Sequence, residues 1–405
     1  MASGSVVSVS DRPRAAHGSR SEVARVLPTW TYRSAELAEI EYECLIRPSW
    51  QFVCHVNQLK KIGDFATLDL KRESVIVVRS KDGNLNAFLN VCRHRAARLL
   101  EGDGNCGRRI TCPYHGWSYD LTGNLVGRPS EKTFEGGKSA LGLKKLELEV
   151  LLGLVFVRIV PGGPSLREMW ADYLPMLEPY RLEEMEPLDA PWIESWECNW
   201  KVAVDNNLEN YHIPVGHPGL QRLLDTDMVG FINRHGIAGS TSTLRARPSP
   251  KWSERLYQKL APTILPELPA EIRDTWQLFT MPPNIGLDVM PDSMDVFQIL
   301  PLGAERCEMR YPIFVRPNEP REVRLQRYLA TRIMRSTTLE DRSLCESIQR
   351  GIGSHDYEFG PLSSLEHCIH DFHERVRTGC PVAALPTAPA AGTMREINHR
   401  LRQQA

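Results

Sequence analysis

Two Cys–His pairs constrain the fold of this chain more than any other feature of its sequence. Cys92 and His94 form the first pair, and Cys112 and His115 form the second pair after an interval of 17 residues. The first pair follows a strong hairpin turn at Asp82-Gly83, between two runs of β-forming residues. Two thiolates and two imidazoles are therefore expected on facing loops, where all four can bind one metal centre.

The mixed composition of each pair indicates which centre they bind. A structural zinc ion can use the same four donors, but zinc fingers usually pair Cys with Cys and His with His. Here each loop supplies one Cys and one His. This suits a [2Fe–2S] cluster with two Cys on one iron and two His on the other, the Rieske arrangement.

A second group of candidate ligands lies about 100 residues further along, in the segment DNNLENYHIPVGH. At about 100° per residue, Asp205, Glu209 and His212 share one face of a predicted helix. Proline and glycine residues break that helix, so His217 can turn back to the same centre. Two imidazoles and a distant carboxylate form the facial triad that binds ferrous iron. The histidine pair alone is more typical of ordinary helix-end residues, and the upstream Cys–His pairs favour iron.

Charge and hydropathy exclude several classes of protein. Lys and Arg number 49 and Asp and Glu number 50, so the net charge is −1 and gives no attraction to nucleic acid or anionic membranes. The longest apolar run, Val150 to Val157, is too short to span a bilayer and is predicted to be one buried strand. The N-terminal residues lack the apolar segment of a signal peptide. We therefore expect a cytoplasmic protein with reduced cysteines.

The chain divides into three parts by pattern, and the predicted fold class is α+β. Residues 1–45 are a tail and a short helix expected to pack on the catalytic domain. Residues 46–161 alternate in short β runs and form a small all-β domain, with a second hairpin turn at Gly123-Asn124. Residues 162–405 form a larger domain of strands and helices. The helices predicted there cover residues 166–180, 201–211, 321–350 and 365–376.

Together these motifs resemble the α subunit of the Rieske non-haem iron oxygenases. The resemblance runs from about Trp50 to Phe372 and includes Asn199-Trp200-Lys201, which is similar to the family's lead-in to the iron helix. It implies a Rieske domain joined to a helix-grip catalytic domain, assembled as a homotrimer. It also implies O2 as a substrate and electrons from NAD(P)H through a separate flavin or iron–sulfur reductase. The chain itself has no GxGxxG dinucleotide motif.

The resemblance also assigns the remaining site residues. The segment Leu339-Glu340-Asp341 is similar to the region that supplies the third iron ligand, which makes Asp341 the iron carboxylate. The sequence leaves Glu340, Asp356 and Asp295 as alternatives. Asp205 is a further candidate that supports the iron site.

Glu209 separates this chain from most of the family, which has Asp three residues before the first iron histidine. The glutamate is similar to the branch acting on quaternary ammonium compounds, which includes carnitine and glycine betaine monooxygenases and stachydrine (proline betaine) demethylase. By resemblance, Glu209 links His212 to His115 of a neighbouring subunit and carries electrons between the iron sites.

The expected activity is oxidative N-demethylation of a small quaternary ammonium compound, stachydrine first, with release of formaldehyde. The alternatives are an aromatic-ring dioxygenase, or a monooxygenase acting on glycine betaine, carnitine or choline. Four aromatic residues lie in the stretch expected to line the pocket, where they either form a cation–π cage or pack in the core. These residues are Trp252, Trp276, Phe279 and Phe297. His367, His370 and His373 are predicted to form a solvated face, and the eight other cysteines to be buried free thiols.

Overall fold

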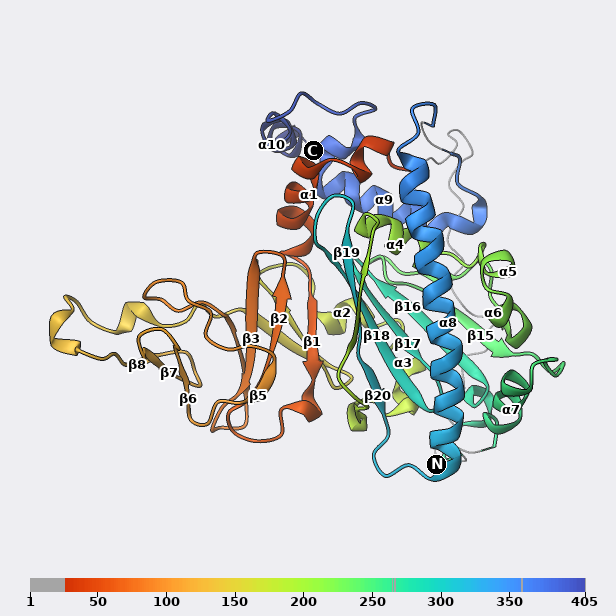
Figure 1. Ribbon diagram of the computed structural model, residues 1–405, viewed down its shortest axis with the longest axis horizontal. Coiled ribbons are helices and arrows are strands. Elements are labelled where there is room, and N and C mark those ends of the chain that lie inside the picture. Colours follow the sequence, from red (N-terminus) through yellow and green to blue (C-terminus); the bar gives the residue numbers. More distant parts are fainter. Residues whose placement is uncertain (1–25, 264, 266, 358–359, 405) are drawn as a thin grey trace.

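The computed structural model describes residues 26–263, 265, 267–357 and 360–404. Most of the expected N-terminal tail, residues 1–25, lies outside this part of the chain. Figure 1 shows a β-rich body on one side of the molecule and a larger body of sheet and helices on the other. The fold class is therefore the predicted combination of a small β domain and an α+β domain.

The β domain contains three small antiparallel sheets among the described residues. Two hairpins have the predicted turns: Asp82-Gly83 between β3 and β4, and Gly123-Asn124 between β7 and β8. Gly83 and Gly123 have φ of 82° and 92°, in the left-handed region that favours glycine. The strands are β1 (Gln51–His55), β2 (Asp64–Leu70), β3 (Glu73–Arg79), β4 (Leu85–Leu89), β5 (Asp103–Asn105), β6 (Arg109–Thr111), β7 (Ser118–Asp120), β8 (Leu125–Gly127), β9 (Glu147–Leu151) and β10 (Leu154–Arg158).

The prediction of one buried strand from Val150 to Val157 was wrong. The run forms two antiparallel strands, β9 and β10, joined by a tight turn at Leu152-Gly153. Gly153 has φ of 79°, and a Cβ there would lie 2.3 Å from Nε2 of His55, so only glycine fits. Because the residues on both sides of the turn are apolar, hydropathy alone could not reveal it.

The larger domain is built on an antiparallel sheet, ten-stranded among the described residues. Its main path runs β11-β20-β18-β17-β16-β15-β13. In addition, β19 pairs with β18 and β12, and β14 pairs with β15. Helix α8 (Arg321–Ile352) crosses the sheet, as Figure 1 shows. The strands are β11 (Glu186–Pro187), β12 (Trp192–Trp196), β13 (Leu224–Thr226), β14 (Phe231–Ile232), β15 (Ala238–Leu244), β16 (Thr275–Met281), β17 (Ile285–Val289), β18 (Ser293–Pro301), β19 (Cys307–Tyr311) and β20 (Ile313–Val315).

The helices agree with the predictions in part. The long helix predicted over 321–350 is α8, and the one over 365–376 is α9. The predicted helix over 166–180 is broken into α2, α3 and a 3-10 turn, and the C-terminal α10 was not predicted. No helix among the described residues is long and apolar enough to cross a membrane. Besides α8, the α-helices are α1 (Ala35–Glu41), α2 (Leu166–Trp170), α3 (Leu174–Leu177), α4 (Trp200–Asn207), α5 (Ile213–Gly216), α6 (Pro218–Leu223), α7 (Trp252–Leu260), α9 (His367–Gly379) and α10 (Met394–Gln404).

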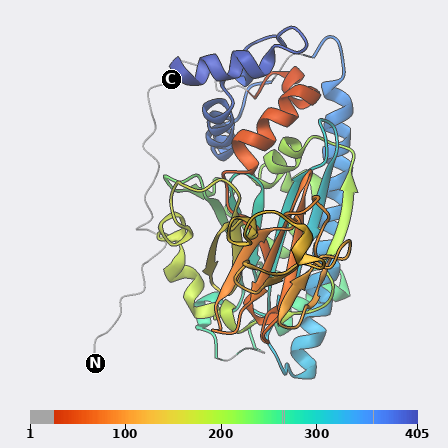
Figure 2. The same cartoon turned by 90° about the vertical axis from the view of Figure 1, so that its left-hand side faces the viewer.

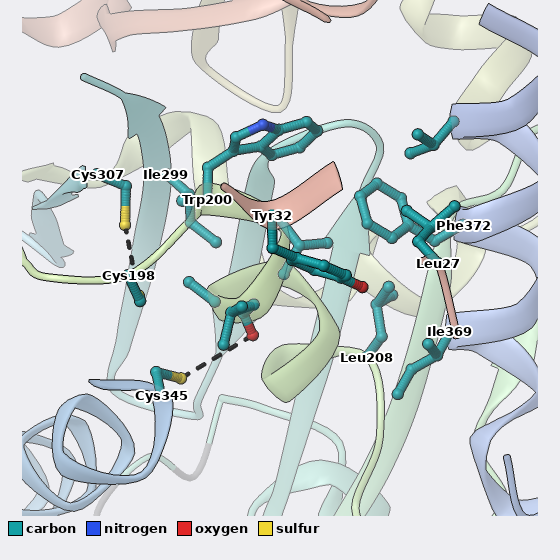
Figure 3. Packing of buried hydrophobic residues seen from close by; sticks show 14 of the residues in the cluster. Leu27, Tyr32, Cys198, Trp200, Leu208, Ile299, Cys307, Cys345, Ile369 and Phe372 are labelled. Atoms are coloured by element: carbon teal, nitrogen blue, oxygen red, sulfur yellow. Dashed lines mark hydrogen bonds between the residues drawn. The ribbon is translucent and has the colours of Figure 1, made fainter. Parts of the chain in front are cut away.

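The two ends of the described chain pack together around α4. Leu37 and Ile40 of α1 belong to the same buried cluster as Phe372 of α9 and Met394 of α10. Figure 2 shows α1 beside the C-terminal helices, and Figure 3 shows Phe372 near Trp200 inside this cluster. The N-terminal segment is therefore part of the support of the catalytic domain.

The cysteines outside the predicted cluster are free thiols. Six of them are buried, including the three that Figure 3 places in the core around α4, and Cys44 and Cys106 are half-buried. The prediction of buried free thiols is thus confirmed for six of the eight.

The Asn-Trp-Lys segment anchors α4 in this core. Asn199 caps the helix by accepting a hydrogen bond from the backbone N–H of Lys201, at 3.0 Å. Nζ of Lys201 lies 2.7 Å from the Glu41 carboxylate, and both side chains are almost fully buried, at 0% and 1% exposure. The indole N–H of Trp200 donates to the same carboxylate at 2.9 Å. The buried ion pair therefore ties α4 to α1.

Replacing Lys201 by methionine is expected to lower the free energy of unfolding by about 3 to 5 kcal/mol, because it leaves the Glu41 carboxylate buried without a counterion. Equilibrium denaturation in urea measures this change. The double variant Lys201→Met with Glu41→Gln removes both charges and should be closer to wild type than Lys201→Met alone. A double variant that loses the sum of the two single effects would show that the pair is not coupled.

Candidate metal centres

The structure brings the four predicted cluster ligands together on two loops of the β domain. Nδ1 of His94 lies 3.2 Å from Nδ1 of His115, and both rings are partly exposed. The thiols of Cys92 and Cys112 are buried beside one another. Burial raises the pKa of Cys92, and the neighbouring thiol of Cys112 raises it further. Two thiols on the inside and two imidazoles on the outside match the donor set of a [2Fe–2S] cluster with mixed ligands.

Two aromatic residues that the sequence analysis missed support this site. The Trp117 ring stacks on His94, with ring centroids 4.8 Å apart and planes 6° apart. The Tyr119 hydroxyl lies 3.4 Å from Sγ of Cys92 and accepts a hydrogen bond from the backbone N–H of Arg93 at 3.0 Å. A hydroxyl that donates to a ligand sulfur stabilises the reduced cluster and raises its potential. The sequence offered one sign of this role, because Trp117 and Tyr119 follow shortly after the predicted ligand His115.

Replacing His115 by cysteine is expected to lower the reduction potential of the cluster by on the order of 100 mV or more, because a thiolate replaces a neutral imidazole and adds negative charge. Redox titration followed through the visible spectrum measures the change, and His94→Cys should shift the potential in the same direction. An unchanged or raised potential would count against ligation by these imidazoles.

His212, His217 and Asp341 converge on one point between α4, α5 and α8. Nε2 of His217 lies 3.0 Å from Nε2 of His212 and 2.8 Å from Oδ1 of Asp341, and the third side of this triangle is 3.6 Å. Ligands bound facially at about 2.1 Å and 90° are about 3.0 Å apart, so these three atoms fit the face of one octahedral ion. They are also the one group among the described residues in which three possible ligand atoms come this close.

The alternative third ligands lie elsewhere. Oε2 of Glu340 is 2.9 Å from Nδ1 of His217, the nitrogen that faces away from the other two ligand atoms. Asp356 is exposed beyond the end of α8, and Asp295 lies on β18 in the wall of the cavity that adjoins the triad. Only Asp341 of these four faces both imidazoles, while Glu340 is placed to orient His217.

The charges around the triad suit a divalent cation. Burial alone would lower the pKa of His212, but the carboxylates of Asp341 and Glu209 outweigh burial and raise it to about 9. The two imidazoles in turn hold the pKa of Asp341 below its usual range, although burial opposes them. Nδ2 of Asn206 lies 3.2 Å from Nε2 of His212, so an amide that the sequence analysis missed also borders the centre.

Glu209 contacts His212 directly. Oε1 of Glu209 is 2.5 Å from Nδ1 of His212, and Oε2 accepts a hydrogen bond from the backbone N–H of His212 at 3.0 Å. The carboxylate therefore holds the ring through the nitrogen that faces away from the other ligands, and it sets the tautomer with Nε2 free to bind a metal.

The prediction that Asp205 shares a helix face with Glu209 and His212 was wrong, because α4 ends at Asn207 and the following residues form a turn. Asp205 instead accepts a hydrogen bond from the Tyr32 hydroxyl at 3.1 Å, and its other oxygen lies 2.9 Å from Nε2 of His373. The described residues show no contact between Asp205 and the His212 ring.

The predicted solvated face of three histidines was also wrong for His373, which is fully buried, although His370 is exposed. Helix α9 turns its apolar residues, including Ile369 and Phe372, toward the core, and His373 follows on the same side. Its partner Asp205 lies far away in sequence, so the α9 pattern alone could not indicate it.

A cavity of about 250 Å³ adjoins His212, His217 and Asp341. Trp276, Phe279 and Phe297 are among its lining residues, and all three also pack in buried hydrophobic clusters, so the expected core packing is confirmed for them. Trp252 is not a lining residue, because it lies on α7 and is 63% exposed, so that prediction was wrong. The lining also includes polar and aromatic residues that the sequence did not indicate, among them Trp192, Asp288, Tyr311 and Arg335.

Comparison with known proteins identifies the family. The model of the Rieske [2Fe-2S] domain matches residues 49–147, and the model of the ring hydroxylating alpha subunit (catalytic domain) matches residues 154–381. The chain is 30% identical over 366 residues to the carnitine monooxygenase oxygenase subunit of Escherichia coli strain K12, covering 86% of this chain and 92% of that protein. It is 26% identical over 363 residues to the glycine betaine monooxygenase oxygenase subunit of Pseudomonas aeruginosa strain UCBPP-PA14, covering 83% and 84%.

A solved structure agrees with these matches. It is a quaternary ammonium Rieske monooxygenase, reported for its insight into carnitine oxidation by gut microbiota and inter-subunit electron transfer. It superposes with a TM-score of 0.75 at 26% identity and covers 88% of this chain and 96% of that one. The chain therefore belongs to the α-subunit family of Rieske non-haem iron oxygenases, enzymes that carry a Rieske [2Fe–2S] cluster and a mononuclear iron.

Proposed function

We propose that this enzyme oxidatively N-demethylates a small quaternary ammonium compound, with stachydrine (proline betaine) as the first substrate to test. The observation that carries the proposal is the cavity beside the His212, His217 and Asp341 triad. At about 250 Å³ it is small for a ligand pocket, and aromatic rings that attract methylated cations line it. Arg335 is the only Lys or Arg side chain among its described lining residues, and it offers a partner for a substrate carboxylate.

The proposed ligands follow from the geometry above. Cys92, Cys112, His94 and His115 would hold the cluster, and the His212–His217–Asp341 triad would hold the iron. When bound, these groups supply one-electron transfer and activation of O2. The chain orients His212 through Glu209 and encloses the substrate in the cavity.

The reaction balances with one O2, two electrons and two protons. One oxygen atom enters a C–H bond of an N-methyl group, and the other oxygen atom leaves as water. The N-hydroxymethyl ammonium product then loses formaldehyde and a proton, which leaves the demethylated amine. Hydroxylation of a backbone carbon next to nitrogen would release the intact methylated amine instead.

The placement of the two metal centres supports electron transfer between subunits, which we propose to form a homotrimer that receives electrons from a separate reductase. Figure 1 places β6 and β7, which flank the second cluster loop, on the opposite side of the molecule from α5, whose two ends carry His212 and His217. Electron transfer within one chain would have to cross that distance. We infer that the cluster of one subunit serves the iron of its neighbour, with Glu209 of one chain near His115 of the other.

A substrate panel tests the proposal. Purified enzyme with a reductase and NAD(P)H is given stachydrine, glycine betaine, carnitine, choline or toluate, and formaldehyde and released amines are quantified. We expect formaldehyde and a demethylated amine from a betaine and no product from toluate. Release of the intact methylated amine would assign a different C–N cleavage, and ring hydroxylation of toluate without formaldehyde from any cation would overturn the proposal.

A further inference from the structure

Two aspartates lie side by side on neighbouring strands of the sheet, on the face that forms one wall of the cavity. Asp288 of β17 and Asp295 of β18 are direct cross-strand partners in the antiparallel register, so their side chains emerge on the same face. Both line the cavity that adjoins the iron triad. Like charges at directly opposed positions destabilise a sheet, so this pair is unusual for an interior wall.

Neither carboxylate has a partner within the described part of the chain. Asp288 is only 8% exposed, yet its side chain makes no hydrogen bond or ion pair there. Oδ1 of Asp295 is buried without a hydrogen bond. Their outer cross-strand neighbours are Leu278 on β16 and Ile313 on β20, which are apolar. The two acids therefore lie between apolar side chains in one row across the sheet. Asp288 is directed into the cavity, and no hydrogen-bond donor of the described residues faces it.

The protein alone does not stabilise the charged form of either acid. Burial raises the pKa of Asp288 well above its ordinary value, and repulsion from Asp295 and Asp341 raises it further. Burial also raises the pKa of Asp295 to about 7, with an added contribution from Asp292. Burying a charged carboxylate without a counterion is destabilising, so each acid favours its neutral form in the free protein. A cation in the cavity beside the pair would favour the charged form of both carboxylates.

We propose that Asp288 and Asp295 form the subsite that recognises the positive charge of the substrate's quaternary nitrogen. The inference rests on the proposed function and narrows it to a residue pair. A quaternary nitrogen has no N–H group, so it needs charge and apolar contact rather than directed hydrogen bonds. The subsite has this character, because two carboxylates without other partners lie among apolar side chains.

The neighbouring residues complete the subsite. The Phe297 ring, two residues beyond Asp295 on the same face of β18, lies over Gly286, where a Cβ would come within 1.7 Å of it. Gly286 therefore makes room for an aromatic wall beside the acid pair. A divalent metal is a weaker candidate, because Mg²⁺ and Ca²⁺ require six or more oxygen ligands and the adjacent row is apolar.

Matched ligand pairs test the subsite independently of turnover. Glycine betaine and 3,3-dimethylbutanoate differ only in nitrogen versus carbon, as do choline and 3,3-dimethyl-1-butanol. Calorimetric titration of the iron-loaded enzyme gives the ratio of the two Kd values within each pair. We expect wild type to bind each cation on the order of tenfold or more tighter than its carbon isostere. Asp288→Asn and Asp295→Asn should each reduce that ratio severalfold and leave isostere binding unchanged.

The controls separate this inference from the proposed function. Leu278→Val changes the volume of the same row without changing charge and should retain the ratio, while iron content and the visible spectrum report folding. If both asparagine variants keep the wild-type ratio, or if Asp288→Asn releases a tightly bound divalent ion other than iron, the subsite is wrong. If wild type shows the ratio but demethylates no member of the panel, the proposed function fails and the cation subsite stands.

Discussion

Glu209→Gln is expected to reduce steady-state turnover about 100-fold or more while both iron centres stay bound, because the contacts of Glu209 orient a ligand without supplying one. The carboxylate lies 2.5 Å from Nδ1 of His212 and accepts from the backbone of the same residue. Glutamine preserves the length of the side chain but removes the charge. Turnover with the best substrate of the panel, together with iron per chain, measures the effect.

Single-turnover kinetics tests the proposed electron bridge. The prereduced variant is mixed with substrate and O2, and oxidation of its Rieske cluster is followed through the visible spectrum. Glu209→Asp keeps the charge on a shorter side chain and should be partly active. If Glu209→Gln oxidises its cluster as fast as wild type, Glu209 does not connect the two sites.

Asp341→Ala is expected to remove the mononuclear iron, abolish turnover and leave the cluster spectrum intact. Oδ1 of Asp341 lies 2.8 Å from Nε2 of His217, so its loss removes one corner of the triad. Iron analysis should fall from about three to about two atoms per chain, because the two centres share no ligand.

Glu340→Gln is the matched control for this variant. It changes the adjacent residue of α8, which contacts the outer nitrogen of His217, and should retain about three irons with reduced turnover. Retention of the mononuclear iron in Asp341→Ala, with its loss in Glu340→Gln, would assign the third ligand to Glu340.

The features that could be predicted from sequence are those set by short stretches of chain. The hairpin turns at Asp82-Gly83 and Gly123-Asn124 depend on residues that favour φ above zero, and they appeared where expected. The long helix α8 carries its own periodicity. The metal-ligand spacing was visible for the same reason, because each pair of ligands lies within one loop.

The features that could not be predicted depend on distant segments. Asp288 and Asp295 face each other only once the register of β17 and β18 is set. Asp205 and His373 are separated by 168 positions, so neither segment alone indicates the contact. The helix-face argument failed because α4 ends at Asn207, and a turn rather than a helix carries Glu209 to His212.

Because α1 packs with α9 and α10, the catalytic domain contains chain from both before and after the β domain. The β domain is therefore an insertion within the catalytic domain. The chain enters that domain through β1 and leaves it through β10, and these two strands are antiparallel neighbours in one sheet. The two points at which the chain passes between the domains therefore lie side by side. Exchanging the segment from β1 to β10 between relatives would therefore transfer the β domain as one unit. A chain cut before β1 would instead lose α1, whose Glu41 pairs with the buried Lys201.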